Sequence, residues 1–238
     1  MNEISSFRQG IKDGIPVCLG YLSVSFAFGI FATESGLSVL QTLLVSMMNV
    51  TSAGQLAGVP IIIAGGGYME LAISQLVINL RYALMSVSLS QKLGKSVQLS
   101  DRFLVSFVNT DEVFAIASGK KNAVGRKYLY GLILTPYLGW SLGTLLGALA
   151  GNVLPESIVS SLGIAIYGMF IAIVIPEAKK CRATALCAAF AVMMSCVLEY
   201  VPLLSRIPSG FAVIICAVFS SALFAFLAPL KEGGNANE

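Results

Sequence analysis

The sequence predicts an all-α polytopic membrane protein, and three observations support this fold class. Of the 238 residues 56% are hydrophobic and 11% are charged, whereas about 25% are charged in a soluble domain. Apolar runs of about 20 residues, the length of a membrane-spanning helix, recur along nearly the whole chain. Two further apolar segments, 37–67 and 102–119, have polar centres. We therefore expect about six full transmembrane helices plus two broken or re-entrant segments.

The full spans follow one another in a single transport domain, 14–228. The first is expected at 14–33, after a polar N-terminal segment, 1–13, that carries Arg8 and Lys12. Pro16 lies in its first turn, where the missing N–H costs little. The other full spans are expected at 68–89, 128–150, 158–176, 183–201 and 209–228. Residues 229–238 are polar, and we expect a flexible C-terminal tail.

The segment 37–67 changes from apolar to polar and back again. Its polar centre contains Asn49, Thr51, Ser52, Gly54 and Gln55. Unwound backbone at membrane depth persists only where it is buried in protein or lines a cavity. Such a broken helix is typical of the binding site of a secondary transporter, so we interpret these five residues as substrate-binding. The alternative is one long helix with a kink at Gly or Pro.

The basic loops determine the expected topology. If every apolar segment crosses the membrane, loops 90–102 and 120–127 lie on opposite sides, in conflict with the positive-inside rule. If segments 37–67 and 102–119 are both re-entrant, these loops and both termini all lie on the cytoplasmic side. Two re-entrant segments of opposite sense are compatible with an inverted repeat. Seven or eight crossings are the alternative.

Three ionisable residues lie far inside apolar segments. Arg81, in the span that also contains Asn79, needs an anionic partner, because an isolated charge there costs at least about 2.5 kcal/mol. Asp111 and Glu112 are the candidate partners and the candidate proton-coupling residues. Asn109 and Thr110 precede them as a predicted helix start, whose N–H groups would suit a substrate carboxylate. The alternative is a purely structural ion pair.

A series of glycines at intervals of four residues lies on one face of the span 128–150. It consists of Gly139, Gly143, Gly147 and Gly151. Small residues at this spacing let another helix approach closely. The neighbour is either a helix of the same chain or a separate subunit, and the second alternative makes this face a partner-packing surface.

Several classes of function are disfavoured by composition. The chain has no histidine, which excludes His metal ligands, Ser–His nucleophiles and His proton relays. The five cysteines are scattered without C-x-x-C spacing, so we expect neither a metal nor another cofactor. No intramembrane protease motif is present, and an enzyme is therefore not expected.

Four motifs in order resemble the AzlC/YgaZ family of branched-chain amino acid permease subunits. They are GIPVCLGYLSVSFAFGIFA, NVTSAGQLAG, NLRYALMSVSL and NTDEVFAIASG. The Asp-Glu pair of the family matches Asp111 and Glu112. The family usually has Phe-Ala-Gly-x-x-Gln where this chain has Thr51-Ser52-Ala53-Gly54-Gln55, and only the small residue, Gly54 and the neighbouring amide carry over. The family often has His where this chain has Tyr82, so a proton role for that His does not carry over.

The resemblance implies the large subunit of a two-component exporter in a bacterial inner membrane. It implies valine, leucine, isoleucine and often methionine as substrates, export driven by proton-motive force, and a small hydrophobic partner of the AzlD/YgaH type. The glycine face would be a dock for that partner. The alternatives are a transporter or channel for another small apolar or organic solute, and a scaffold subunit that is inactive without its partner.

Overall fold

The computed structural model describes residues 3–151, 171, 174–175, 178–179, 181–202 and 204–228. The chain divides into two compact units, Met1–Val59 with Asn79–Ile166, and Pro60–Ile78 with Tyr167–Glu238. We call them unit 1 and unit 2. The predicted polar residues of both segment centres belong to unit 1. Whether the two units act as one transport domain stays a prediction.

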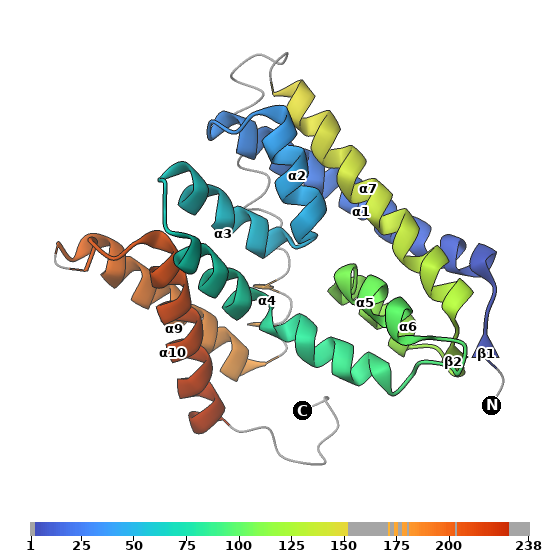
Figure 1. The fold of residues 1–238 in the computed structure, drawn as a ribbon. Helices are drawn as coiled ribbons and strands as arrows, with labels where there is room; N and C mark the ends of the chain where they lie inside the picture. The colour runs from blue at the N-terminus through green and yellow to red at the C-terminus, as the bar shows by residue number, and fades with distance from the viewer. Residues whose placement is uncertain are drawn as a thin grey trace. The chain divides into compact units, whose positions relative to one another are not determined.

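Two long parallel helices, α1 (Phe7–Glu34) and α7 (Arg126–Ala150), form the centre of unit 1 (Figure 1). Gly10 contacts the backbone around Gly131, and Gly29 contacts the backbone around Gly147. Contacts therefore advance in the same direction along both helices. A side chain at any of these glycines would collide with a backbone carbonyl of the other helix, so the close packing depends on their lack of a Cβ.

The predicted glycine face of the span 128–150 also packs against α1. Gly139 contacts Cys18, Gly143 contacts Leu22, and Gly147 contacts Phe26. Gly151 lies close to Thr33 and Ile30. The neighbour is thus a helix of the same chain, which corrects the partner-packing interpretation of these four glycines: α1 already occupies the face that a separate subunit would need.

Each of the two segments with a polar centre forms a pair of short helices. The first contains α2 (Val39–Asn49) and α3 (Ser52–Ile63), and the second contains α5 (Leu99–Phe107) and α6 (Asp111–Ser118). Ser38 caps α2 in a capping box with Gln41, which fixes where that helix begins. The helix breaks at 50–51 and 108–110 lie where the sequence predicts them.

The second pair of short helices starts and ends at the same end of unit 1. The strand β1 (Glu3–Ile4) pairs in parallel with β2 (Ala123–Val124), and Leu93 forms a bridge to Val124. The loop before α5 and the loop after α6 are therefore hydrogen-bonded to each other and to the N-terminal strand. This agrees with a re-entrant α5–α6 segment and with the predicted grouping of the basic loops.

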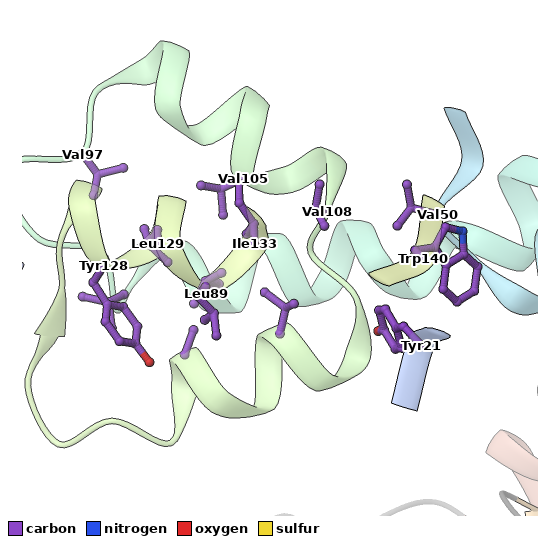
Figure 2. Close-up of a cluster of buried hydrophobic side chains, with 14 residues drawn as sticks. Tyr21, Val50, Leu89, Val97, Val105, Val108, Tyr128, Leu129, Ile133 and Trp140 are labelled. Carbon is purple, nitrogen blue, oxygen red and sulfur yellow. The ribbon is translucent and has the colours of Figure 1, made fainter. Parts of the chain in front are cut away.

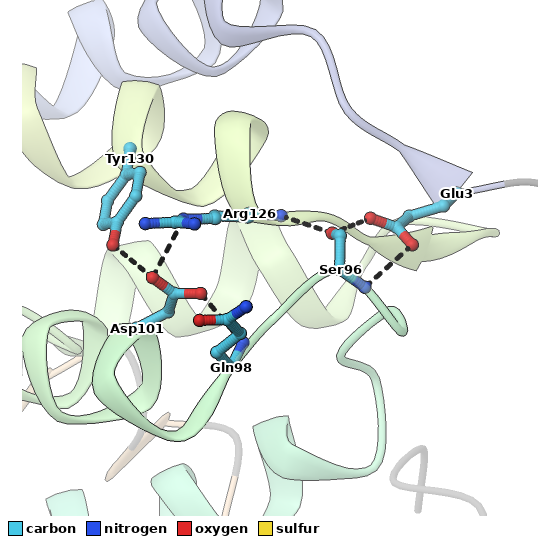
Figure 3. Close-up of polar contacts among 6 residues, drawn as sticks. All are labelled: Glu3, Ser96, Gln98, Asp101, Arg126 and Tyr130. Carbon is cyan, nitrogen blue, oxygen red and sulfur yellow. Dashed lines mark hydrogen bonds and ion pairs between the residues drawn. The ribbon is translucent and has the colours of Figure 1, made fainter.

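Side chains around α5 strengthen this polar end (Figure 3). Tyr130 donates a hydrogen bond to Asp101, whose carboxylate also lies 3.0 Å from Arg126 Nε. The Gln98 backbone N–H donates to Asp101 Oδ2 at 2.8 Å. The Tyr130 hydroxyl, followed by the Gln98 N–H and the Arg126 charge, holds the pKa of Asp101 below its ordinary 3.8. Ser96 likewise binds the Glu3 carboxylate.

A buried hydrophobic cluster lies between α5, α6 and α7 in unit 1 (Figure 2). Val105 and Val113 from the short helices pack in the same cluster as Leu129 and Ile133 from α7. Burying an aliphatic side chain of this size is worth about 1.5–3 kcal/mol. The cluster therefore holds the second helix break against α7.

The described residues contain five helices long and apolar enough to cross a membrane. They are α1, α4 (Tyr68–Ser90), α7, α9 (Arg182–Tyr200) and α10 (Ser209–Leu227). These correspond to five of the six predicted full spans. The sixth, 158–176, lies almost entirely outside the described residues, as does the predicted tail 229–238. The chain is thus an all-helical, polytopic membrane protein.

Candidate functional site

The first helix break contains an unusual backbone conformation. Val50 ends α2 with φ 46° and ψ 37°, in the left-handed region, and its side chain is buried. A β-branched residue in this region is a genuine outlier, at a cost of order 1–3 kcal/mol. The strain is held by surrounding contacts, and strain of this kind is found at functional sites.

Polar side chains of α7 hold the last turn of α2. Trp140 Nε1 donates to the Ser46 carbonyl at 3.2 Å, and the Tyr137 hydroxyl donates to the Met47 carbonyl at 3.3 Å. The hydroxyls of Ser46 and Thr144 are 2.6 Å apart. Carbonyls at a helix end need such partners when water is absent. Trp and Tyr are often found at the surfaces of a membrane. Tyr137 and Trp140 lie too far inside their span for such a position, and this depth is the sequence signal for their role.

The second break lies at Val108, Asn109 and Thr110, after which α6 begins at Asp111. The nine residues of α5 and the eleven of α2 correspond to about 14 Å and 16 Å of helix at 1.5 Å per residue. The hydrocarbon core is about 30 Å thick. Both breaks therefore lie about half-way through a bilayer if α2 and α5 start at its surfaces.

The second half of α4 contacts both breaks through successive polar side chains. Tyr82 donates to Thr51 Oγ1 at 3.3 Å in the first break. Arg81 Nη1 lies 2.9 Å from Asp111 Oδ2, and Asn109 Nδ2 donates to Ser86 Oγ at 3.1 Å. The structure thus brings together residues of three segments that the sequence analysis predicted separately. We call these residues of α4 and the two breaks the break site.

Arg81 has the anionic partner that its position requires. Its guanidinium also donates from Nη2 to the Tyr82 hydroxyl at 3.2 Å and lies 4.9 Å from the centre of the Tyr82 ring. About half of each side chain of the Arg81–Asp111 pair is exposed. An isolated charge at membrane depth costs at least about 2.5 kcal/mol, so loss of either partner is expected to destabilise the protein.

Glu112 has a different environment from its neighbour Asp111. The Tyr21 hydroxyl of α1 donates a hydrogen bond to Glu112 Oε2. Tyr21 itself is buried, and its ring meets Trp140 edge to face with centroids 5.0 Å apart. Among the described residues, Glu112 forms no ion pair. The sequence analysis did not identify Tyr21, because nothing in its local pattern distinguishes it from a packing residue.

Two buried amide oxygens near the breaks have no hydrogen-bond partner among the described residues. They are Gln55 Oε1 in the first turn of α3 and Asn109 Oδ1 in the second break. The Gln55 and Asn109 side chains are 1% and 3% exposed. Leaving a buried acceptor unsatisfied costs about 1–3 kcal/mol. Such oxygens are therefore candidates for accepting hydrogen bonds from a substrate ammonium group.

The remaining predicted substrate-binding residues lie around the same breaks. Asn49 is the last residue of α2, Ser52 is the first residue of α3, and Gly54 is buried in its first turn. Thr110 is the N-cap residue of α6, and Asn79 lies on α4 two residues before Arg81. No group of three or more potential metal ligands occurs within the residues that the structure describes.

An apolar cavity of about 400 Å³ adjoins the second break on the α7 side. It is lined in part by Phe107, Val108, Ile133 and Tyr137. Tyr137 is the same residue that binds the end of α2. The break site thus combines charged and amide groups with a neighbouring aliphatic and aromatic surface.

Comparison with known proteins places these features in a family context. A family model described as AzlC protein matches residues 16–154, which include both breaks and the α4 contacts. The inner membrane protein YgaZ of Escherichia coli is 28% identical over 93% of this chain and 92% of its own length. An uncharacterized membrane protein of Archaeoglobus fulgidus is 30% identical over 75% of this chain and 79% of its own length. No solved structure matches.

Proposed function

Because the chain belongs to the AzlC family, we propose that it is the large subunit of an exporter of branched-chain amino acids, driven by proton-motive force. The family is linked to branched-chain amino acid transport. The observation that carries the proposal is the break site: two helix breaks, both contacted by the same polar stretch of α4. Substrate sites of secondary transporters are built from such discontinuous helices.

The chemistry of the break site suits a zwitterion with an aliphatic side chain. A substrate carboxylate would bind the N-terminal turn of α6 or compete with Asp111 for Arg81. The ammonium group would donate to the unpartnered oxygens of Gln55 or Asn109. The aliphatic side chain would lie against the apolar lining near Val108.

The two acids take different roles in the proposed mechanism. Asp111 lies 2.9 Å from the guanidinium of Arg81, so its protonation would leave that cation without its carboxylate partner. Among the described residues, the neutral Tyr21 hydroxyl donates a hydrogen bond to Glu112, which takes part in no ion pair there and is exposed. We assign proton uptake to Glu112, because it can become neutral without leaving a cation unpaired. Asp111 and Arg81 then act as the substrate-responsive pair.

The proposal is tested by export from cells loaded with a leucine-containing dipeptide, in which the chain is expressed with and without a small AzlD/YgaH-type subunit. We expect faster leucine efflux with both chains, and loss of the effect on addition of a protonophore. Unchanged efflux with both chains present would reject the proposed substrate. Co-purification of the two chains tests the proposed partner separately.

The assignment of the proton carrier is tested in the same system. Glu112→Gln should abolish proton-driven efflux while leucine exchange across the membrane continues, since exchange needs no net proton movement. Glu34→Gln is the matched control, because Glu34 is an exposed acid at the end of α1. Undiminished proton-driven export by Glu112→Gln would refute the role of this residue.

A further inference from the structure

A second cavity of about 260 Å³ lies in unit 1 between the end of α4 and α5. Its lining includes Ser86 and Ser90 from α4, and Arg102, Ser106 and Asn109 from α5 and the second break. Leu93, which bridges to β2 at the polar end of unit 1, also lines it. The cavity therefore extends from the polar end, beside the basic loop 90–102, to the second break. We call it the α4–α5 crevice.

The inner end of the crevice presents a buried hydrogen-bond acceptor. Asn109 is 3% exposed, and its Nδ2 is engaged by Ser86 at 3.1 Å. Its Oδ1 has no hydrogen-bond partner among the described residues. A buried oxygen that lacks a partner in the empty site gains a hydrogen bond when a donor enters. The natural donor for an isolated acceptor of this kind is an ammonium or amide group.

The outer end of the crevice presents a cation. Arg102 is exposed, and no ion pair involves it within the described part of the chain. A free guanidinium binds carboxylates through charge-assisted, often bidentate hydrogen bonds. Arg102 and Asn109 are seven positions apart, which corresponds to about 10 Å at the helical rise of about 1.5 Å per residue. A small zwitterion and a flexible arginine side chain together span this distance.

The wall between these two groups is apolar. Leu89 and Val105 line the crevice and are buried in the hydrophobic cluster of unit 1. An amino acid lying along the crevice would place its carboxylate at Arg102 and its ammonium at Asn109, with its side chain against this wall. A carboxylic acid without an amine would use only Arg102.

We propose that the α4–α5 crevice is a binding vestibule for a zwitterionic amino acid on the basic side of the protein, from which the substrate reaches the break site. The inference rests on the proposed transport function: the crevice shares Asn109 with the break site and adds Arg102 as a second recognition group. Arg102 selects for the carboxylate, and Asn109 Oδ1 selects for the ammonium group.

Equilibrium binding to the purified protein in nanodiscs tests both groups without relying on transport. The probes are leucine, 4-methylpentanoate, which lacks the amine, and 3-methylbutylamine, which lacks the carboxylate. Arg102→Gln should weaken binding of leucine and the acid about tenfold or more but leave the amine unchanged. Asn109→Ala should weaken leucine and the amine but not the acid. Lys95→Gln, an exposed basic residue outside the lining, is the matched control.

Accessibility of the crevice provides a second readout. In a chain whose five cysteines are replaced by serine, Ser106→Cys should react with a membrane-impermeant thiol reagent only from the cytoplasmic side. Leucine should slow this reaction. Labelling from the opposite side, or leucine binding that neither substitution weakens, would overturn the vestibule.

The two proposals fail in distinguishable ways. If leucine is not exported but another amino acid protects Ser106→Cys and depends on Arg102 and Asn109, the vestibule is supported and the proposed substrate is wrong. If leucine is exported but neither crevice substitution alters binding, the transport function is supported and the vestibule is wrong. If the substitutions weaken binding of 4-methylpentanoate but not of leucine, the crevice is a carboxylate site, and the proposal that it binds a zwitterion is rejected.

Discussion

At the scale of single residues, neighbouring acids in the same helical turn have different partners. Asp111 faces the guanidinium of Arg81, and Glu112 faces the hydroxyl of Tyr21. The Arg81 pairing was predictable, because a charge inside a membrane must be neutralised and the chain offers few acids at that depth. The Tyr21 contact was not predictable, because the direction of its hydroxyl depends on how α1 packs against α7.

Tyr21→Phe isolates the contribution of that hydroxyl. The substitution keeps the aromatic contact with Trp140 and removes the donor to Glu112. A hydrogen bond to a charged group is worth about 1.5–3 kcal/mol, so we expect proton-driven efflux to fall about tenfold or more. The measurement is initial efflux rate normalised to protein in the membrane. Tyr68→Phe, at a residue that is 93% exposed, is the control, and an equal loss in both variants would contradict the role of Tyr21.

At the scale of helices, polar centres in apolar segments predicted both breaks. The glycine pattern did not decide whether a helix of the same chain or a separate subunit packs on the glycine face. The polar centres predict the breaks because the N–H and C=O groups of unwound backbone need hydrogen-bond partners, which lipid cannot supply. The glycine spacing indicates only that some helix approaches closely. It does not encode which helix, since α1 lies more than a hundred residues earlier in the chain. The strained Val50 was equally hidden, because its sequence neighbours do not indicate a left-handed residue.

The α1–α7 contact predicts unequal effects of two identical substitutions. Gly147→Ala would place a methyl group against the Phe26 carbonyl, and we expect a loss of about 1–3 kcal/mol in the free energy of unfolding. Gly20→Ala meets no atom within 4 Å and should be neutral or stabilising by up to about 1 kcal/mol. The measurement is the unfolding midpoint in detergent. A comparable loss for both variants would refute the close packing.

The polar end of α5 predicts a pH dependence of stability. The contacts of Asp101 lower its pKa in the folded protein below 3.8. Its stabilising contribution is therefore complete above pH 3.8 and is lost as the pH falls through the lower, folded-state pKa. We expect wild type to unfold at higher temperature than Asp101→Asn at pH 7, with a smaller difference below pH 3.8. A difference that does not shrink on acidification would show that Asp101 acts through packing alone.

At the scale of the whole molecule, the structure and the charge pattern agree on which loops lie together. The loops on either side of the α5–α6 segment meet the N-terminal strand at one end of unit 1. A helix of 28 residues, α1, leads away from that end. The sequence predicted this arrangement from the basic residues alone, because the charge bias constrains sidedness even when helix packing is unknown.

Thiol labelling of intact cells tests this topology. In the chain without native cysteines, Lys95→Cys and Asn122→Cys should react only after the reagent is given access to the cytoplasm. Glu34→Cys, at the far end of α1, should react from outside. Labelling of Lys95→Cys and Asn122→Cys from opposite sides would mean that α5–α6 crosses the membrane completely.

The parallel glycine contact between α1 and α7 also constrains how the protein is made. Gly10 and Gly131 meet in the folded chain, yet a ribosome adding about 5–20 residues per second needs roughly 6–24 s to synthesise the chain between them. During that interval α1 has left the ribosome and its glycine face has no α7 to receive it. Biogenesis therefore includes a stage before α7 is synthesised in which lipid, the insertion machinery or one of the helices between α1 and α7 covers this face. The helix α1 therefore meets its permanent neighbour only after α2 to α6 have been synthesised.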